Sequence, residues 1–190
     1  MQAGYPALKR GNPRATVLGW CADISNPAWG AALSDAARAC IDVFSFHNYI
    51  NSVPGGGTLP FAGELPDHRK QWPPQVTECW NTEGTNADVC ANSLYTVPPL
   101  CDPDRNARAT AFASRVWVEH ARAGVSKYFV YTMHNTDTMM YNGGYQSLLI
   151  GYDRTPTPAA VATAVTAYCI DGLRFLQCPG SDGVVQAAFG

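Results

Sequence analysis

The stretch PPQVTECWNTEG, residues 73–84, decides how the chain folds. It passes from two prolines into a short β-branched run and then sets Glu78 beside a cysteine and a tryptophan. The run at residues 75–78 is predicted to be a buried strand, because it is short and bounded by prolines. Glu78 would then end that strand at its carboxyl side, where ligands bind in α/β proteins.

Other apolar runs predict strands of the same kind. They do not alternate cleanly between apolar and polar residues, which is typical of strands buried on both faces. These runs lie at residues 16–20, 41–46 and 127–132. Helical patterns lie between and after the strands, at residues 27–40, 104–123 and 157–169. Strands that alternate with helices predict an α/β fold with a parallel sheet.

The composition indicates one globular domain and excludes some partners. The chain has 190 residues, 46% of them hydrophobic and 15% charged. A net charge of −2 gives no electrostatic reason to expect nucleic acid or an anionic membrane surface as a partner. No run of about eighteen apolar residues predicts a membrane span. The start, MQAGYPALKRGNPRATV, has no apolar h-region, so we expect no signal peptide there.

The seven cysteines are many for a cytosolic protein of this size and favour a secreted one. Cys90 and Cys101 bracket a loop that a disulfide between them would close. No C-x-x-C spacing occurs, so the cysteines do not predict a zinc or thioredoxin-type site. The odd number leaves one sulfur, which is either a buried free thiol or one whose partner lies in further sequence.

Polar and aromatic residues gather where the predicted strands end. An ionised carboxylate stabilises the cationic transition state of glycoside cleavage and can capture it covalently, while aromatic rings pack on sugars. Glu78 is therefore the predicted nucleophile. The residues predicted to bind substrate are His47, Tyr49, Trp80 and Asn135.

The segments FSFHNY (44–49), PQVTECW (74–80) and KYFVYTM (127–133) resemble strands six, seven and eight of the retaining (β/α)8 glycoside hydrolases that use two glutamates. In those enzymes a segment like V-T-E ends strand seven with the nucleophile, which implies Glu78. The sixth strand ends in H-x-Y, matched here by His47 and Tyr49. The stretch NPRATVLGW, residues 12–20, is similar to the lead into strand five.

This resemblance implies a partial (half) TIM barrel in residues 1–171 and the start of a β-sandwich-like module in residues 172–190. The sequence departs from the pattern twice. It contains no Asn-Glu pair to supply the acid/base glutamate, and Met133 stands where those enzymes usually have tryptophan. The alternative fold is a small doubly wound sheet of four strands.

The function implied is retaining hydrolysis of O-glycosyl bonds, with this chain carrying the nucleophile half of the site and being weak or inactive alone. The expected partners are an oligo- or polysaccharide and a missing N-terminal half-barrel, or else self-association through open sheet edges. We expect no cofactor and no metal. The alternative is a non-catalytic carbohydrate-binding or interaction module.

Several other assignments stay open. Glu83 could be the functional carboxylate, although it falls in what the pattern predicts to be a polar turn. Glu64 is the candidate replacement for the acid/base. A metal site built from His47, Cys79 and His134 lacks the usual ligand spacing. The sequence contains no G-x-S-x-G motif, so it does not predict a serine nucleophile.

Overall fold

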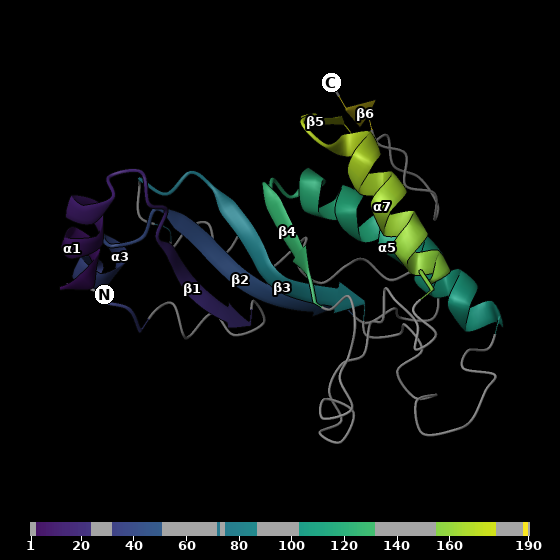
Figure 1. Cartoon of the computed structure of the whole chain (residues 1–190), viewed down its shortest axis with the longest axis horizontal. Coiled ribbons are helices and arrows are strands. Elements are labelled where there is room, and N and C mark those ends of the chain that lie inside the picture. The colour runs from purple at the N-terminus through teal and green to yellow at the C-terminus, as the bar shows by residue number, and fades with distance from the viewer. Residues whose placement is uncertain are drawn as a thin grey trace, which may run out of the picture.

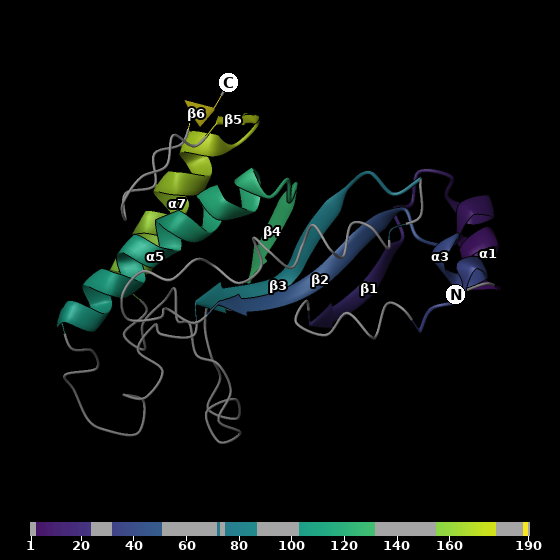
Figure 2. The same cartoon turned by 180° about the vertical axis from the view of Figure 1, so that it is seen from behind.

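A computed structural model of the chain describes residues 3–23, 32–50, 72, 75–86, 103–131, 155–177 and 188–189. Its centre is a twisted sheet of four strands (Figure 1). Two short helices stand at the amino ends of the first two strands, and two longer helices lie side by side near the fourth strand. Seen from behind, the second helix of this pair leads into a small strand pair near the C-terminus (Figure 2).

The sheet is parallel throughout, and its strand order, β1-β2-β3-β4, follows the sequence. Its strands are β1 (Leu18–Asp23), β2 (Val43–Ile50), β3 (Cys79–Asn86) and β4 (Lys127–Val130). A doubly wound sheet reverses its strand order at a switch point, whereas consecutive strands of a (β/α)8 barrel are neighbours. The observed order confirms the α/β fold and its resemblance to part of a barrel. The doubly wound alternative is wrong.

The third strand begins where the sequence predicts that it ends. The first hydrogen bond between this segment and β2 is donated by the Phe44 amide to the Glu78 carbonyl, at 3.0 Å. The strand β3 starts at the next residue, Cys79. Val76 and Cys79 are 6% and 1% exposed, so the apolar run packs into the core as it approaches the sheet. The polar residues that follow, predicted to be a turn, form the strand itself.

The long helices match their predictions closely. They are α5 (Pro103–Arg122) and α7 (Pro158–Ile170). The Ala160 amide donates to the Thr157 hydroxyl at 3.2 Å, and a proline occupies the first turn of α7. Gly124 has φ 77°, the left-handed conformation that ends a helix. In the described part of the chain, no helix is both long and apolar enough to cross a membrane.

The amino-terminal helices differ more from the prediction. The helix expected over residues 27–40 is seen as α3 (Asp35–Arg38), and residues 24–31 lie outside the described ranges. The Ala37 amide donates to the Ser34 hydroxyl at the start of α3, at 3.3 Å. A further helix that the sequence analysis does not predict, α1 (Gly4–Gly11), precedes β1.

The core lies between the sheet and α5. Phe44 and Phe46 are 2% and 0% exposed and pack with Val116 of α5. Since side chains alternate along a strand, His47 belongs to the opposite face of β2 from these two rings. The cluster of buried apolar residues comprises Ile41, Phe44, Phe46, Val76, Cys79, Val116 and Val125.

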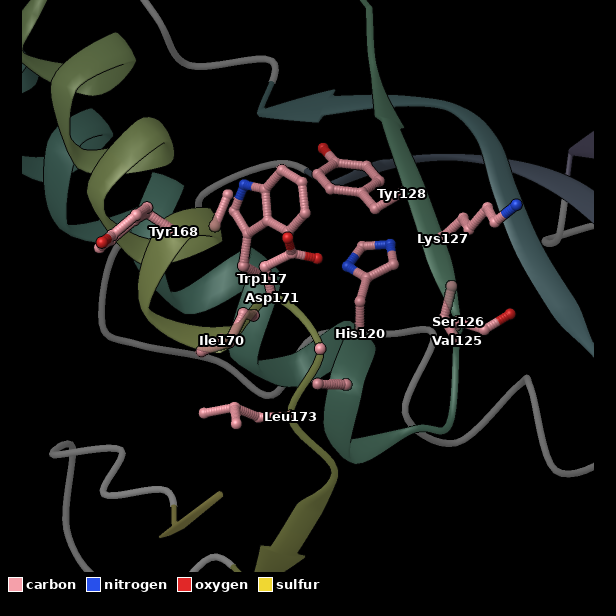
Figure 3. A pocket seen from close by; sticks show the side chains of 13 residues that line it. Trp117, His120, Val125, Ser126, Lys127, Tyr128, Tyr168, Ile170, Asp171 and Leu173 are labelled. Carbon is pink, nitrogen blue, oxygen red and sulfur yellow. The ribbon is translucent and has the colours of Figure 1, made fainter. Parts of the chain in front are cut away.

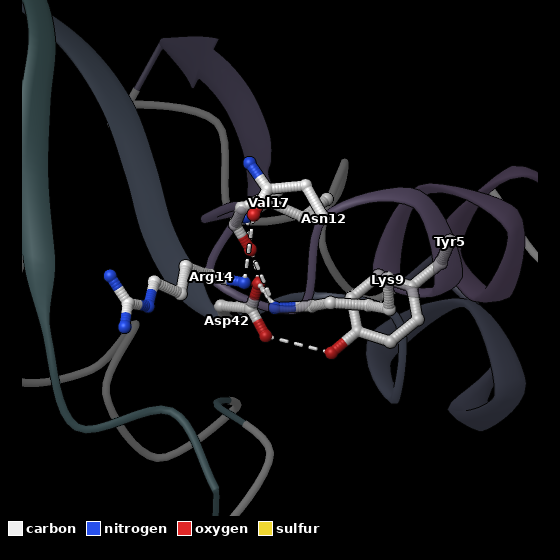
Figure 4. A network of polar contacts seen from close by, with 7 residues as sticks. Tyr5, Lys9, Asn12, Arg14, Val17 and Asp42 are labelled. Atoms are coloured by element: carbon white, nitrogen blue, oxygen red, sulfur yellow. Dashed lines mark hydrogen bonds and ion pairs between the residues drawn. The ribbon is translucent and has the colours of Figure 1, made fainter.

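A polar network fastens α1 to the amino end of the sheet (Figure 4). Asp42 accepts hydrogen bonds of 2.7 Å from the Tyr5 hydroxyl and the Val17 amide, and it pairs with Lys9 at 2.7 Å. Burial alone raises the pKa of Asp42, but the bonds from Lys9, Val17 and Tyr5 outweigh it, so the pKa lies below its ordinary value. The ionised carboxylate therefore holds helix and strand together.

The chain continues after α7 into a two-stranded antiparallel ladder. It consists of β5 (Phe175–Gln177) and β6 (Ala188–Phe189), and Gly172, with φ 73°, starts the turn into it. Both strands fall within the predicted β extension. The division of the chain into residues 1–171 and 172–190 stays a prediction.

Candidate active site

A histidine and a glutamate meet on neighbouring strands in the carboxyl-terminal half of the sheet. His47 of β2 lies opposite Glu83 of β3 in register, and His47 Nδ1 is 3.7 Å from Glu83 Oε2. Their side chains are 29% and 34% exposed, so both remain open to a ligand. The same register row begins with Asp23, the last residue of β1. A carboxylate beside an imidazole at this end of a parallel sheet has the chemistry of a catalytic site.

A β-bulge creates the His47–Glu83 pair. Phe46 lies opposite Asn81, but His47 lies opposite Glu83, so Thr82 is an extra residue on β3. The Thr82 hydroxyl donates to the Phe46 carbonyl at 3.2 Å and fixes the bulge to β2. Bulges near functional sites re-aim side chains. Here the bulge brings Glu83 into register with His47.

Gly84 allows the strands to approach closely just after Glu83. A Cβ atom at this position would overlap the carbonyl oxygen of Asn48 and lie 2.7 Å from Asn81 Nδ2. It would also lie 3.1 Å from the Tyr128 ring. The glycine is therefore required by its neighbours on β2, β3 and β4.

Glu78 lies at the other end of the sheet. It directly precedes β3, and the hydroxyl of Ser126, the residue before β4, donates to Glu78 Oε1 at 3.0 Å. The expectation that Glu78 ends a strand at its carboxyl side is wrong. Glu83, in contrast, is the fifth of the eight residues of β3 and lies in the carboxyl-terminal half of the strand.

The other predicted binding residues are spread along the sheet. Trp80 is the second residue of β3, and Lys127 Nζ lies 3.9 Å above its ring centroid, so a cation covers one ring face. Tyr49 lies in β2 opposite Thr85, two residues beyond His47. Asn135 lies outside the described residues.

Several other residues considered in the sequence analysis also lie outside the residues that the structure describes. The predicted pair Cys90 and Cys101, as well as Glu64 and His134, fall outside the described ranges. Cys79, the companion of His47 in the metal site weighed from the sequence, is buried at the start of β3. Among the described residues, no group of three or more His, Cys, Asp and Glu side chains is arranged to hold a metal ion.

Sequence reasoning undervalued Glu83 and assigned no role to His120. The polar neighbours of Glu83 predict a turn, which disfavours a catalytic role for it. One signal pointed to it: a Thr-Glu pair occurs twice within the opening stretch, at 77–78 and again at 82–83. The bulge at Thr82 and the hydrogen bond between Asn81 and His120 of α5 distinguish the second pair, and neither has a signature in a single sequence.

Comparison with known proteins identifies the fold. No protein family and no curated protein matches this sequence. Among solved structures, a family 39 glycoside hydrolase from the gut symbiont Bacteroides cellulosilyticus WH2 is similar, with a TM-score of 0.63 and 18% sequence identity. The match covers 98% of this chain and 40% of that structure.

At 18% identity this likeness concerns the fold alone. The four parallel strands and their helices resemble part of a glycoside hydrolase barrel. The chain spans 40% of the length of the solved structure that it matches.

Proposed function

We propose that this chain carries the nucleophile half of the active site of a retaining glycoside hydrolase, with Glu83 as the nucleophile. One observation carries the proposal. In a sheet that resembles part of a glycoside hydrolase barrel, a bulge sets a solvent-accessible carboxylate beside His47 in the carboxyl-terminal half of the strands. The proposal moves the predicted role from Glu78 to Glu83 and keeps His47 as a substrate-binding residue.

The chemistry follows from the carboxylate. A Glu83 oxygen forms a bond to the anomeric carbon of an oligo- or polysaccharide while the bond from that carbon to the leaving oxygen breaks. The leaving oxygen keeps the electron pair and takes up a proton. Water then cleaves the glycosyl ester, which restores the carboxylate and releases the sugar with its original configuration.

Protonation of the leaving oxygen needs a second carboxyl group about 5–5.5 Å away. Of the four glutamates in the sequence, Glu78 lies at the amino end of the sheet and Glu119 pairs with Arg122 on α5. Glu64 lies outside the described residues. We therefore expect weak or no hydrolysis of ordinary glycosides by this chain alone.

Activated substrates test the proposal without the acid. A 2,4-dinitrophenolate leaves without protonation, so a panel of dinitrophenyl glycosides probes the nucleophile directly. We expect slow hydrolysis by the intact chain, with the first product retaining the anomeric configuration in a proton NMR spectrum. The Glu83→Ala variant should lose this activity, and added azide should restore turnover and give the glycosyl azide of inverted configuration. Glu78→Ala is the matched control and should behave like the wild type.

Two results would contradict the proposal. Loss of activity in Glu78→Ala, with azide rescue there, would return the nucleophile to the position first predicted. Sugar binding that survives Glu83→Gln unchanged, with no hydrolysis of any activated substrate, would instead identify a carbohydrate-binding module.

We also propose that further strands complete the barrel, either from a missing N-terminal half or from a second copy of the chain. In the described part of the sheet, β1 and β4 each pair on one side only, and such edges invite strand addition. Analytical ultracentrifugation over a wide range of concentrations tests self-association. A cooperative monomer at every concentration would argue against pairing between copies.

A further inference from the structure

A buried hydrogen-bond chain connects α5 to the backbone of Glu83. His120 Nδ1 lies 2.7 Å from the Val116 carbonyl oxygen one turn earlier in the helix. His120 Nε2 lies 2.8 Å from Asn81 Nδ2. The Glu83 amide donates to Asn81 Oδ1 at 3.3 Å. This series of hydrogen bonds therefore runs from α5 to β3 and ends at Glu83, the residue proposed as nucleophile.

The donor and the acceptor of each hydrogen bond can be assigned in turn, starting from the Val116 carbonyl. A carbonyl oxygen only accepts, so His120 Nδ1 must carry the ring proton. The neutral ring then presents a bare Nε2, which accepts from the Asn81 amide nitrogen. This orients the Asn81 side chain so that its oxygen faces the Glu83 amide. Each group thus has one role, and the reversed Asn81 amide would lose both contacts.

The surroundings hold His120 neutral and in place. His120 and Asn81 are 2% and 0% exposed. The His120 ring stacks on Tyr128 with centroids 4.2 Å apart, and Trp117 meets Tyr128 edge-on at 5.1 Å. These three rings line a pocket of about 610 Å³ that also contacts β4 and the end of α7. Figure 3 shows the three side chains around it. Burial lowers the pKa of His120 to about 4, so the proton on Nδ1 is the one it keeps at neutral pH.

We infer that His120 and Asn81 are positioning residues, which hold the bulge and so fix Glu83 opposite His47. The bulged residue, Thr82, lies between Asn81 and Glu83, so the Asn81 side chain spans the bulge from inside the core. Neither residue faces the substrate, since both are buried on the α5 side of the sheet. The inference rests on the proposed function for its catalytic meaning, but the geometry it predicts is independent of any reaction.

Amide hydrogen exchange in the intact, 15N-labelled chain tests the inference. Asn81→Leu keeps the side-chain shape and removes both hydrogen bonds, and His120→Phe keeps the aromatic stack and removes the ring nitrogens. We expect both to speed exchange at Thr82, Glu83 and Gly84 by about tenfold or more.

Cys79→Ala is the matched control, because Cys79 is equally buried on β3 but makes no contact in this chain of bonds. It should loosen the core without singling out residues 82–84. If Asn81→Leu and His120→Phe affect these amides no more than Cys79→Ala does, the inference is overturned. If Asn81→Leu fails to fold, His120→Phe decides the matter.

Kinetics on dinitrophenyl glycosides add a second readout. A positioning role predicts that His120→Phe lowers kcat by about tenfold or more and leaves KM nearly unchanged, whereas a merely structural role would lower the amount of active protein in the same way as Cys79→Ala. If exchange changes as expected and the wild type hydrolyses no glycoside, the positioning role stands and the proposed function fails.

Discussion

The two ends of the parallel sheet carry two different kinds of carboxylate. At the amino end, Asp42 is bound by Tyr5, Lys9 and Val17, and Glu78 accepts from Ser126. In the carboxyl-terminal half, Glu83 stands 3.7 Å from His47, and about a third of its side chain is exposed. The carboxylates at the amino end connect neighbouring elements, while the carboxylate in the carboxyl-terminal half remains accessible to a ligand.

Two glutamates that are close in sequence show how the two ends of the sheet differ. Glu83 lies five positions after Glu78 in the sequence, and both follow a threonine. Only the second is set by a bulge and connected to a buried histidine through Asn81. Structure that constrains a side chain without covering it is typical of a site that must meet a ligand.

The largest expected effect separates these two glutamates. Glu83→Gln should lower the rate of hydrolysis of dinitrophenyl glycosides by a factor on the order of 10³ or more, because the nucleophile is lost. Glu78→Gln should change it by less than about threefold, since that side chain lies away from the site. Initial rates at matched protein concentration, with circular dichroism to check folding, measure the contrast.

The second prediction concerns the buried histidine that connects through Asn81 to the carboxyl-terminal half of the sheet. His120 has a pKa of about 4 in the folded chain against an ordinary value of 6.5, so the unfolded state binds more protons between these two pH values. The free energy of unfolding should therefore fall, by on the order of 3 kcal/mol in total, as the pH is lowered from 6.5 to 4.

Urea unfolding at half-unit pH steps measures this slope. Between pH 6.5 and 5 the slope should be clearly flatter in His120→Phe than in the wild type, because the titrating group is gone. Equal slopes in the two proteins would show that His120 does not stay neutral in the folded chain.

The third prediction tests the close approach of strands after Glu83. Gly84→Ala should destabilise the fold by about 1–3 kcal/mol, because the new methyl group meets a backbone carbonyl and a buried amide that cannot move aside easily. Gly4→Ala is the control, since nothing lies within 4 Å of a Cβ there and alanine favours a helix. Chemical denaturation of both variants should give opposite signs. Similar small effects would mean that the strands near Glu83 are loosely packed.

The smallest expected effect lies at the amino end. Asp42→Asn should cost about 1–2 kcal/mol at neutral pH, because a neutral amide replaces a carboxylate that accepts three hydrogen bonds. The pKa of Asp42 is lowered in the folded chain, so its contribution is present above the ordinary value of 3.8 and is lost as the pH falls through the folded pKa. The difference in stability between the two proteins should therefore start to shrink as the pH falls below 3.8 and vanish below the folded pKa, and glycoside hydrolysis at neutral pH should be unaffected.

The sequence predicts much of this fold because its two long helices and three of its strands have strong local signals. The apolar runs at 41–46 and 127–132 overlap β2 and β4, and α5 and α7 begin and end within a residue of their predicted bounds. Periodicity and capping residues carry those predictions. The resemblance to a glycoside hydrolase barrel agrees with the fold that the comparison with solved structures indicates.

The candidate site is where sequence reasoning fails, and the cause is physical. Residues 81–86 read NTEGTN, a composition typical of turns, yet they form a strand because β2 and β4 pair with them on both sides. Tertiary pairing overrides local preference there. A strand that carries a binding site needs polar side chains, and close packing of its neighbours can require a glycine. These residues give β3 the sequence pattern of a turn.

The most direct test of the central claim is to trap the glycosyl ester and find its position. The intact chain is incubated with 2-deoxy-2-fluoroglycosyl fluorides, whose leaving group needs no acid and whose ester hydrolyses slowly, and the labelled peptide is fragmented in a mass spectrometer. The account predicts that the added mass lies on Glu83. A label on Glu78, five residues away at the opposite end of the sheet, would contradict it.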